Sequence, residues 1–112
     1  MVMNTFKALF AMKIPSYMQG FDYVEDAMEL YNRNNAPFTN MRLLYFYVGQ
    51  KNKVSSSTVM KAISDLIDYA YEKGNKGETI KYFGLTRRSN GNHLAVLYQR
   101  LKEEKGARDK DK

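Results

Sequence analysis

Apolar residues recur along the chain with the period of an α-helix. One stripe follows the spacing i, i+3, i+6, i+7, i+10 and consists of Phe21, Val24, Ala27, Met28 and Tyr31. Three further stripes lie at 41–48, 59–70 and 94–101, and shorter helices are expected at 4–12 and 77–83. Side chains at such intervals share one face of a helix and are buried together. The pattern therefore predicts an all-α fold, a compact bundle of about six helices.

Proline, glycine and short polar residues mark the breaks between these helices. Pro15 interrupts the first segment, and Pro37, within NNAPFTN, excludes helix just before it. Gly74 follows Tyr71-Glu72-Lys73 and is predicted to end that helix in a left-handed conformation, which glycine reaches without steric cost. The polar loop RRSNGN precedes the last helix, and either Asn90 or Asn92 is able to cap it.

The segment 45–70 contains two amphipathic helices joined by about four residues, KNKV. Gly49 lies where two crossing helices need a small residue, and Val54 can fill the turn. Ser55 or Ser56 supplies an N-cap oxygen for the second helix. The turn position that often holds glycine is Lys53, next to Asn52, and either residue can adopt a left-handed conformation, asparagine more easily. This arrangement predicts a helix-turn-helix.

The second helix of this motif begins with short polar side chains on the face opposite its apolar stripe. Ser57, Thr58 and Lys61 occupy that face. A DNA-reading helix needs such residues at its N-terminal end so that its backbone can approach base edges, and its free amides attract phosphate. The alternative is an ordinary helical hairpin whose serines only cap and solubilise it.

Charge adds a second indication of the partner. The chain has 18 Lys and Arg against 12 Asp and Glu, a net charge of +6, which favours a polyanion such as nucleic acid or merely keeps a small domain soluble. The cations concentrate in the later segments. Outside the motif, Lys81, Arg87 and Arg88 form a candidate phosphate clamp. The candidate phosphate contacts are Lys51, Lys53, Ser55, Ser56, Arg87 and Arg88.

Composition excludes several other classes of protein. At 112 residues the chain forms about one domain, which we expect over 1–104, followed by a disordered charged tail over 105–112. It has no cysteine and one histidine, so no metal, cofactor or enzymatic activity is expected. No apolar run is long enough to span a membrane, and the first dozen residues lack the features of a signal peptide. A cytoplasmic protein is expected.

Two polar features allow more than one interpretation. His93 can bind phosphate when protonated, although a capping or surface histidine is the favoured interpretation. An acidic group in the first third lies at helical spacing and could suggest a metal site, although a solvated face is the favoured interpretation; it could instead dock a basic partner. It consists of Asp22, Glu25, Asp26 and Glu29.

Three blocks of sequence carry a family resemblance. They are KIPSYMQGFDYVEDAMEL (13–30), the helix-turn-helix through AISDLIDYAYEKGN (62–75), and IKYFGLT (80–86). In this order and spacing the chain resembles, over 13–104, the C-terminal effector domain of the stage-zero sporulation response regulators of endospore-forming bacteria. The resemblance implies a six-helix domain whose third and fourth helices, about 40–51 and 56–73, form the helix-turn-helix.

The resemblance also implies which residues read DNA. The base-reading positions of the family fall on Ser57, Thr58, Met60 and Lys61, where its members typically carry Ser, Arg, Glu and Arg. Thr58 and Met60 thus replace a guanine-reading arginine and an acidic cytosine acceptor. The implied partners are double-stranded DNA, neighbouring copies on DNA, and an RNA polymerase sigma factor that contacts the helix after the recognition helix.

Two classes of function remain open from sequence. The first is a DNA-binding transcription regulator with its recognition helix at about 56–73. The second is a protein-interaction module that keeps the fold but lacks sequence-specific DNA reading, and that acts on the transcription machinery or a related regulator. The receiver domain that precedes this domain in the family is not contained in these 112 residues, which fits either an excised domain or a stand-alone protein.

Overall fold

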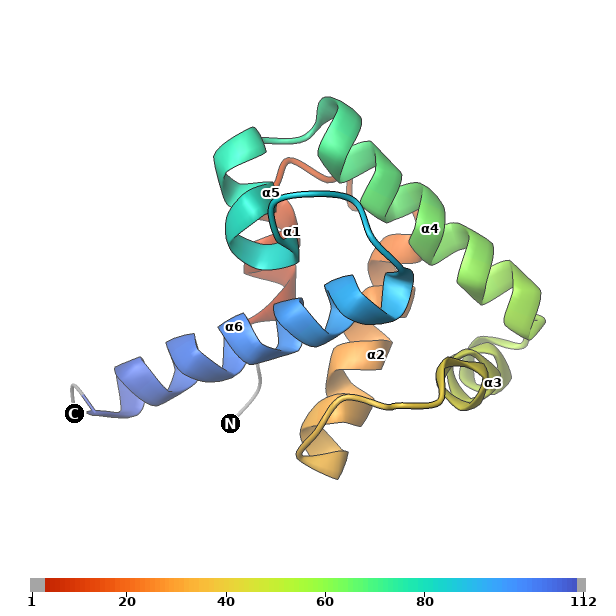
Figure 1. Ribbon diagram of the computed structural model, residues 1–112. Coiled ribbons are helices and arrows are strands. Elements are labelled where there is room, and N and C mark those ends of the chain that lie inside the picture. The colour runs from red at the N-terminus through yellow and green to blue at the C-terminus, as the bar shows by residue number, and fades with distance from the viewer. Residues whose placement is uncertain (1–3, 111–112) are drawn as a thin grey trace.

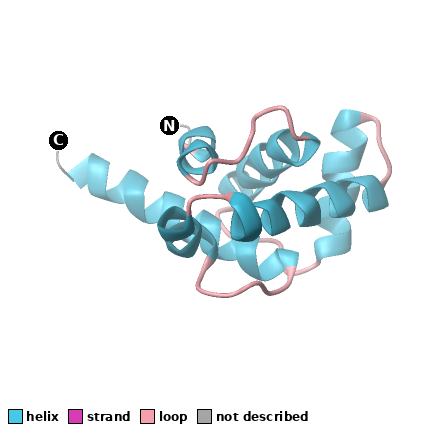
Figure 2. Ribbon diagram, turned by 90° about the horizontal axis from the view of Figure 1, so that it is seen from above, coloured by secondary structure: helices cyan, strands magenta, loops and turns pink. Residues whose placement is uncertain are grey.

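Six helices account for most of the computed structural model, which describes residues 4–110 and the side chains as far as residue 106 (Figures 1 and 2). No strand occurs within these residues. The helices are α1 (Thr5–Ala11), α2 (Gln19–Asn34), α3 (Met41–Asn52), α4 (Ser56–Lys73), α5 (Lys76–Phe83) and α6 (Asn90–Lys110). The predicted all-α bundle is confirmed, and the shorter helices begin and end within one residue of the expected positions.

The apolar stripes meet in a single core. The second helix, α2, packs mainly against α4, and α6 crosses both of them. The buried side chains include the stripe of α2 and, from α4, Val59, Ile63, Leu66, Ile67 and Ala70. At the crossing of α2 and α4, Gly20 faces the carbonyl of Ala62 so closely that a Cβ atom would overlap its oxygen. The backbones of these two helices are therefore in direct contact.

Gly74 corrects one sequence prediction. Its φ is −80° and its ψ −176°, an extended conformation that any residue adopts, so the predicted left-handed cap is wrong. The reason for a small residue is space, because a Cβ atom would lie 2.5 Å from Met12 O and 2.6 Å from Ala70 O. The neighbouring Asn75 N–H donates to Met12 O at 2.9 Å, which ties the end of α4 to the end of α1.

The start of α6 differs from expectation as well. Ser89 caps it, because its Oγ accepts from Asn92 N at 3.2 Å and its carbonyl accepts from His93 N at the same distance. The side chain of Asn90 turns towards α4 instead.

The last helix also continues through most of the predicted tail. It reaches Lys110, whereas residues 105–112 were expected to be disordered, and 111–112 lie outside the described residues. Both views show its C-terminal end projecting from the body of the molecule (Figures 1 and 2). None of the described helices is long and apolar enough to cross a membrane.

Candidate nucleic-acid interface

The turn between α3 and α4 is short and tightly bonded. Lys53 ends α3 in the left-handed conformation, with a φ of 59° and a ψ of 41°, so lysine rather than asparagine takes the position that often holds glycine. Val54 N–H then donates to Gly49 O at 2.9 Å. A Cβ atom at Gly49 would lie 2.7 Å from Val54 O, so this glycine leaves room for the backbone of the turn. The predicted helix-turn-helix geometry is present.

Hydroxyl groups cluster at the N-terminal end of α4. Ser55 is the N-cap, and its Oγ accepts from Thr58 N at 3.1 Å. The same oxygen lies 2.8 Å from Thr58 Oγ1 and 3.1 Å from Ser57 Oγ. All four residues from Ser55 to Thr58 are exposed. Short polar groups and free helical amides therefore face solvent together, as an anion-binding helix end requires.

The four residues expected to face bases are all exposed on α4, away from its buried stripe. Met60 keeps 45% of its surface exposed although it is apolar. Beyond Lys61 the same face becomes acidic, because Asp65, Asp68 and Glu72 follow at helical spacing and are exposed. Only the first two turns of α4 thus favour a phosphate backbone.

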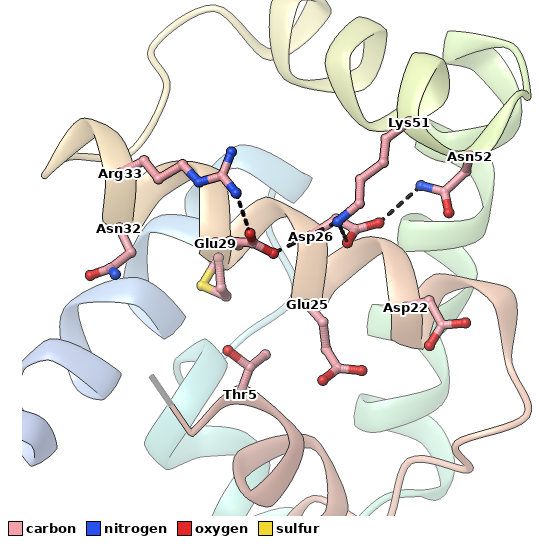
Figure 3. A pocket seen from close by; sticks show the side chains of 10 residues that line it. Thr5, Asp22, Glu25, Asp26, Glu29, Asn32, Arg33, Lys51 and Asn52 are labelled. Atoms are coloured by element: carbon pink, nitrogen blue, oxygen red, sulfur yellow. Dashed lines mark hydrogen bonds and ion pairs between the residues drawn. The ribbon is translucent and has the colours of Figure 1, made fainter. Parts of the chain in front are cut away.

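Lys51 is held in an acidic groove on α2 (Figure 3). Its Nζ lies 2.7 Å from Asp26 Oδ1 and 3.7 Å from Glu29 Oε2. The hydrogen bond that Lys51 donates to Asp26 raises the pKa of Lys51. Asn52 completes the contact, because its Nδ2 donates to Asp26 Oδ2 at 2.9 Å. Lys51 therefore ties α3 to α2, and a DNA phosphate would have to compete with two carboxylates for it.

The acidic group of α2 is in part structural rather than fully solvated. Asp26 exposes only 14% of its side chain because Lys51 and Asn52 cover it. Glu29 pairs with Arg33 at 2.5 Å. Burial raises the pKa of Glu25, and the neighbouring Asp22 raises it further. In the part of the chain that the structure describes, no group of three or more acidic or histidine side chains could hold a metal ion.

The two adjacent arginines have different surroundings. Arg87 Nε donates to Asp68 Oδ1 at 2.7 Å, and its Nη2 donates to Asn90 Oδ1 at 3.1 Å. Arg88 is exposed, and its guanidinium makes no hydrogen bond or ion pair with any described residue. Lys81 pairs with Glu104 at 3.5 Å. Of these three cations, Arg88 alone is open to a phosphate.

His93 is buried, so the expected capping or surface position is wrong. Its Nδ1 donates to Phe83 O at 2.8 Å, and its Nε2 accepts from Arg88 N at 2.6 Å. Burial lowers the pKa of His93. The side chain therefore joins the end of α5 to the following loop as a neutral imidazole and does not face solvent as a phosphate ligand would.

Asn90 is a second residue of this region whose role differs from the one that its sequence position predicts. Instead of capping α6, its amide contacts α3, α4 and the loop before α6. An asparagine beside a glycine at a helix start is an ordinary capping signal, and no sequence pattern distinguishes that role from a tertiary contact.

The six described helices around one core, with the exposed start of α4 following a tight turn, define the class of helix-turn-helix domains. The chain belongs to the family described as sporulation initiation factor Spo0A C terminal, whose model matches residues 5–101. That family consists of DNA-binding transcription-factor domains of a sporulation regulator and is not a class of enzymes. The match contains no receiver region. A comparison with curated proteins finds no match to the chain.

Proposed function

We propose that this protein is a cytoplasmic transcription regulator that places the N-terminal half of α4 in the major groove of double-stranded DNA. The observation that carries the proposal is the exposed surface formed by Ser57, Thr58 and Lys61 opposite the buried stripe of α4. Membership of a DNA-binding family supports it. The acidic later turns of α4 confine the contact to its beginning.

Each base-facing residue offers a different chemistry. Lys61 can donate to guanine O6 and N7, and the hydroxyls of Ser57 and Thr58 can donate or accept. Met60 has no donor, and its exposed side chain suits apolar contact with a thymine methyl group. Because Thr58 and Met60 replace the family's arginine and glutamate, we infer a target sequence different from that of the relatives.

Phosphate contacts would come from groups around this surface. Lys53, Arg88 and Ser56 are exposed and can approach a DNA backbone, and the Ser55 hydroxyl is exposed although it also caps α4. Lys51 and Arg87 contribute only if their ion pairs with Asp26 and Asp68 open.

The test begins with selection of a preferred duplex from a random pool. Lys61→Ala is then measured on the selected duplex and on a scrambled one. We expect the selected duplex to lose the larger share of affinity, about 1–3 kcal/mol, because a base contact carries sequence information. Lys7→Ala on α1 removes the same charge away from α4 and is the control.

Equal losses on both duplexes would make Lys61 a phosphate contact. A chain that binds DNA without any salt dependence would contradict the proposal, because each phosphate contact made by a lysine or arginine steepens the fall of log affinity with log salt by about 0.9.

A second candidate is the interaction module that acts on the transcription machinery. Apolar side chains on and after α5, the helix that follows the recognition helix, favour it: Ile80 is 37% exposed and Leu85 76%. The family resemblance implies sigma-factor contact on this helix and contact between neighbouring copies through α6. Ile80→Lys with Leu85→Lys should abolish sigma-factor binding while leaving affinity for the selected duplex intact or higher. If the double variant still binds the sigma factor as tightly as the unchanged chain, this candidate is removed.

A further inference from the structure

The loop of residues 84–89, between α5 and α6, is fixed at both ends although it has no secondary structure of its own (Figure 1). At its beginning, the hydroxyl of Tyr71 donates to Gly84 O at 2.8 Å and lies 3.3 Å from Thr86 O. At its end, the backbone N–H of Arg88 donates to the buried ring of His93. The backbone of the loop therefore has a defined path beside α4.

Arg87 fastens the same loop to α4 through its side chain. All three of its guanidinium nitrogens are used: Nε on Asp68, Nη2 on Asn90 and Nη1 on the carbonyl of Arg88. A planar guanidinium fits such a divergent set of acceptors because its donors are held in a fixed fork. Arg87 thus positions the backbone of Arg88, while the guanidinium of Arg88 makes no hydrogen bond or ion pair with the residues that the structure describes.

Asn90 joins this loop to the two helices of the helix-turn-helix. Its Oδ1 accepts from Arg87 and, at 3.2 Å, from Ser64 Oγ on α4. Its Nδ2 lies 2.9 Å from Ser64 Oγ, 3.2 Å from Tyr45 Oη on α3 and 3.3 Å from Met60 O on α4. An amide supplies an acceptor and two donors from one side chain, which neither a carboxylate nor an alcohol of similar size does.

We propose that Asn90 is a positioning residue for DNA binding: it locks the loop 84–89 onto α4, and so holds Arg88 beside the recognition helix as a preorganised phosphate contact. The inference rests on the proposed function. Its physical basis is entropy, since a cation held in place loses less freedom on binding than one on a mobile loop. The contacts run from Asn90 through Arg87 to the backbone of Arg88, without direct contact between the amide and the Arg88 side chain.

A double-mutant cycle tests the coupling. The slope of log affinity against log salt is measured on the selected duplex for the unchanged chain, Arg88→Ala, Asn90→Ala and the double variant. In the unchanged chain, Arg88→Ala should make this negative slope less steep by about one, as the loss of one phosphate contact does. In the Asn90→Ala chain, the same substitution should change the slope by less, because Arg87 then keeps only Asp68 on α4 and positions the carbonyl of Arg88 less firmly.

Controls separate positioning from general loss of stability. Asn92→Ala removes the same kind of side chain from an exposed position in the first turn of α6. In the Asn92→Ala chain, Arg88→Ala should keep its full effect on the salt slope. Asp68→Asn breaks the Arg87 ion pair at an exposed position where folding is little affected, and should reduce the effect of Arg88→Ala as well. This second cycle keeps the test usable if Asn90→Ala unfolds the chain.

Three results would overturn the inference. One is an equal effect of Arg88→Ala with and without Asn90, which would show that the two residues act independently. Another is no effect of Arg88→Ala on the salt slope of the unchanged chain, while Lys61→Ala still weakens binding, which would leave the proposed function intact. The last is the absence of salt-dependent DNA binding by the unchanged chain, in which case the proposed function fails too.

Discussion

The imidazole of His93 donates through one nitrogen and accepts through the other, so only the neutral ring satisfies both neighbours. Protonation would place a second N–H against the backbone N–H of Arg88. Burial lowers the pKa of His93, and the positive charges of Arg87 and Arg88 lower it further. The hydroxyl of Tyr71 is the other titratable group that faces the ring. Burial raises its pKa above the ordinary value of a tyrosine, so it stays neutral at the pH values at which His93 titrates.

We expect the stability of the fold to fall in mild acid because of this residue. The unfolded chain takes up the proton near pH 6.5, whereas the folded protein does so only at lower pH. The free energy of unfolding should therefore be constant above pH 6.5 and should decrease as the pH is lowered from there towards the depressed pKa. Urea unfolding between pH 5.5 and 8 measures it. His93→Gln should flatten that dependence, and an equally steep curve would contradict the assignment.

At Lys53, the residue that would suit DNA binding is not the residue that would make the fold most stable. A lysine in the left-handed region is strained, and glycine removes that strain. Lys53→Gly should raise the free energy of unfolding by about 1 kcal/mol. The same change should weaken DNA binding, because one phosphate contact is lost. Thermal unfolding and the salt slope measure the two effects. Lys53→Ala removes the charge without relieving the backbone, so it should weaken binding without stabilising the fold.

At the scale of elements, the helix-turn-helix depends on how closely its turn folds back on α3. The carbonyl of Val54 occupies the space that a side chain at residue 49 would need. Val59, at the start of α4, is fully buried, so the turn cannot move outward without exposing it.

Gly49→Leu should therefore cost at least about 1–3 kcal/mol in stability, because the neighbouring atoms are backbone and cannot change rotamer. Gln50→Leu is the matched control, because it introduces the same side chain at the neighbouring position, which is exposed. Thermal unfolding of both variants measures the difference. Equal melting temperatures would contradict the close approach.

At the scale of the molecule, α6 both closes the core and extends beyond it. Leu101, 2% exposed, is its last buried side chain among those described. Glu104 accepts from Tyr82 Oη at 2.9 Å and from Lys81, which ties the helix to α5. The predicted domain boundary at residue 104 stays a prediction that truncation can test.

Removal of the residues after Lys105 should leave the melting temperature within about 2 °C, because the buried positions and the Glu104 contact remain. Removal of the residues after Arg100 also deletes Leu101 and Glu104. The second truncation should cost about 2–5 kcal/mol, which lowers the melting temperature by about 10 °C or more. Calorimetry compares the two chains, and a large loss in the first would move the domain boundary towards the C-terminus.

Periodicity and capping chemistry predicted the helices, the turn and a serine cap at Ser55 or Ser56, of which Ser55 is the one observed, because each depends on residues within a few positions of one another. What they could not predict depends on partners far away in the chain. Lys51 looks like any exposed lysine until α2 brings Asp26 to it. The amide of Asn90 and the ring of His93 likewise take their roles from tertiary contacts. The candidate base-facing residues remain a prediction.

The contact of Gly20 with the carbonyl of Ala62 bears on whether the motif is a module. The surface that holds α4 in place belongs to α2, which lies outside the motif, and to α6, which comes after it. A peptide containing only α3 and α4 would uncover Leu66, which is fully buried and lies against Gly20 of α2. Grafting these two helices onto another scaffold would not transfer their geometry, since the smallest transplantable unit is the whole domain.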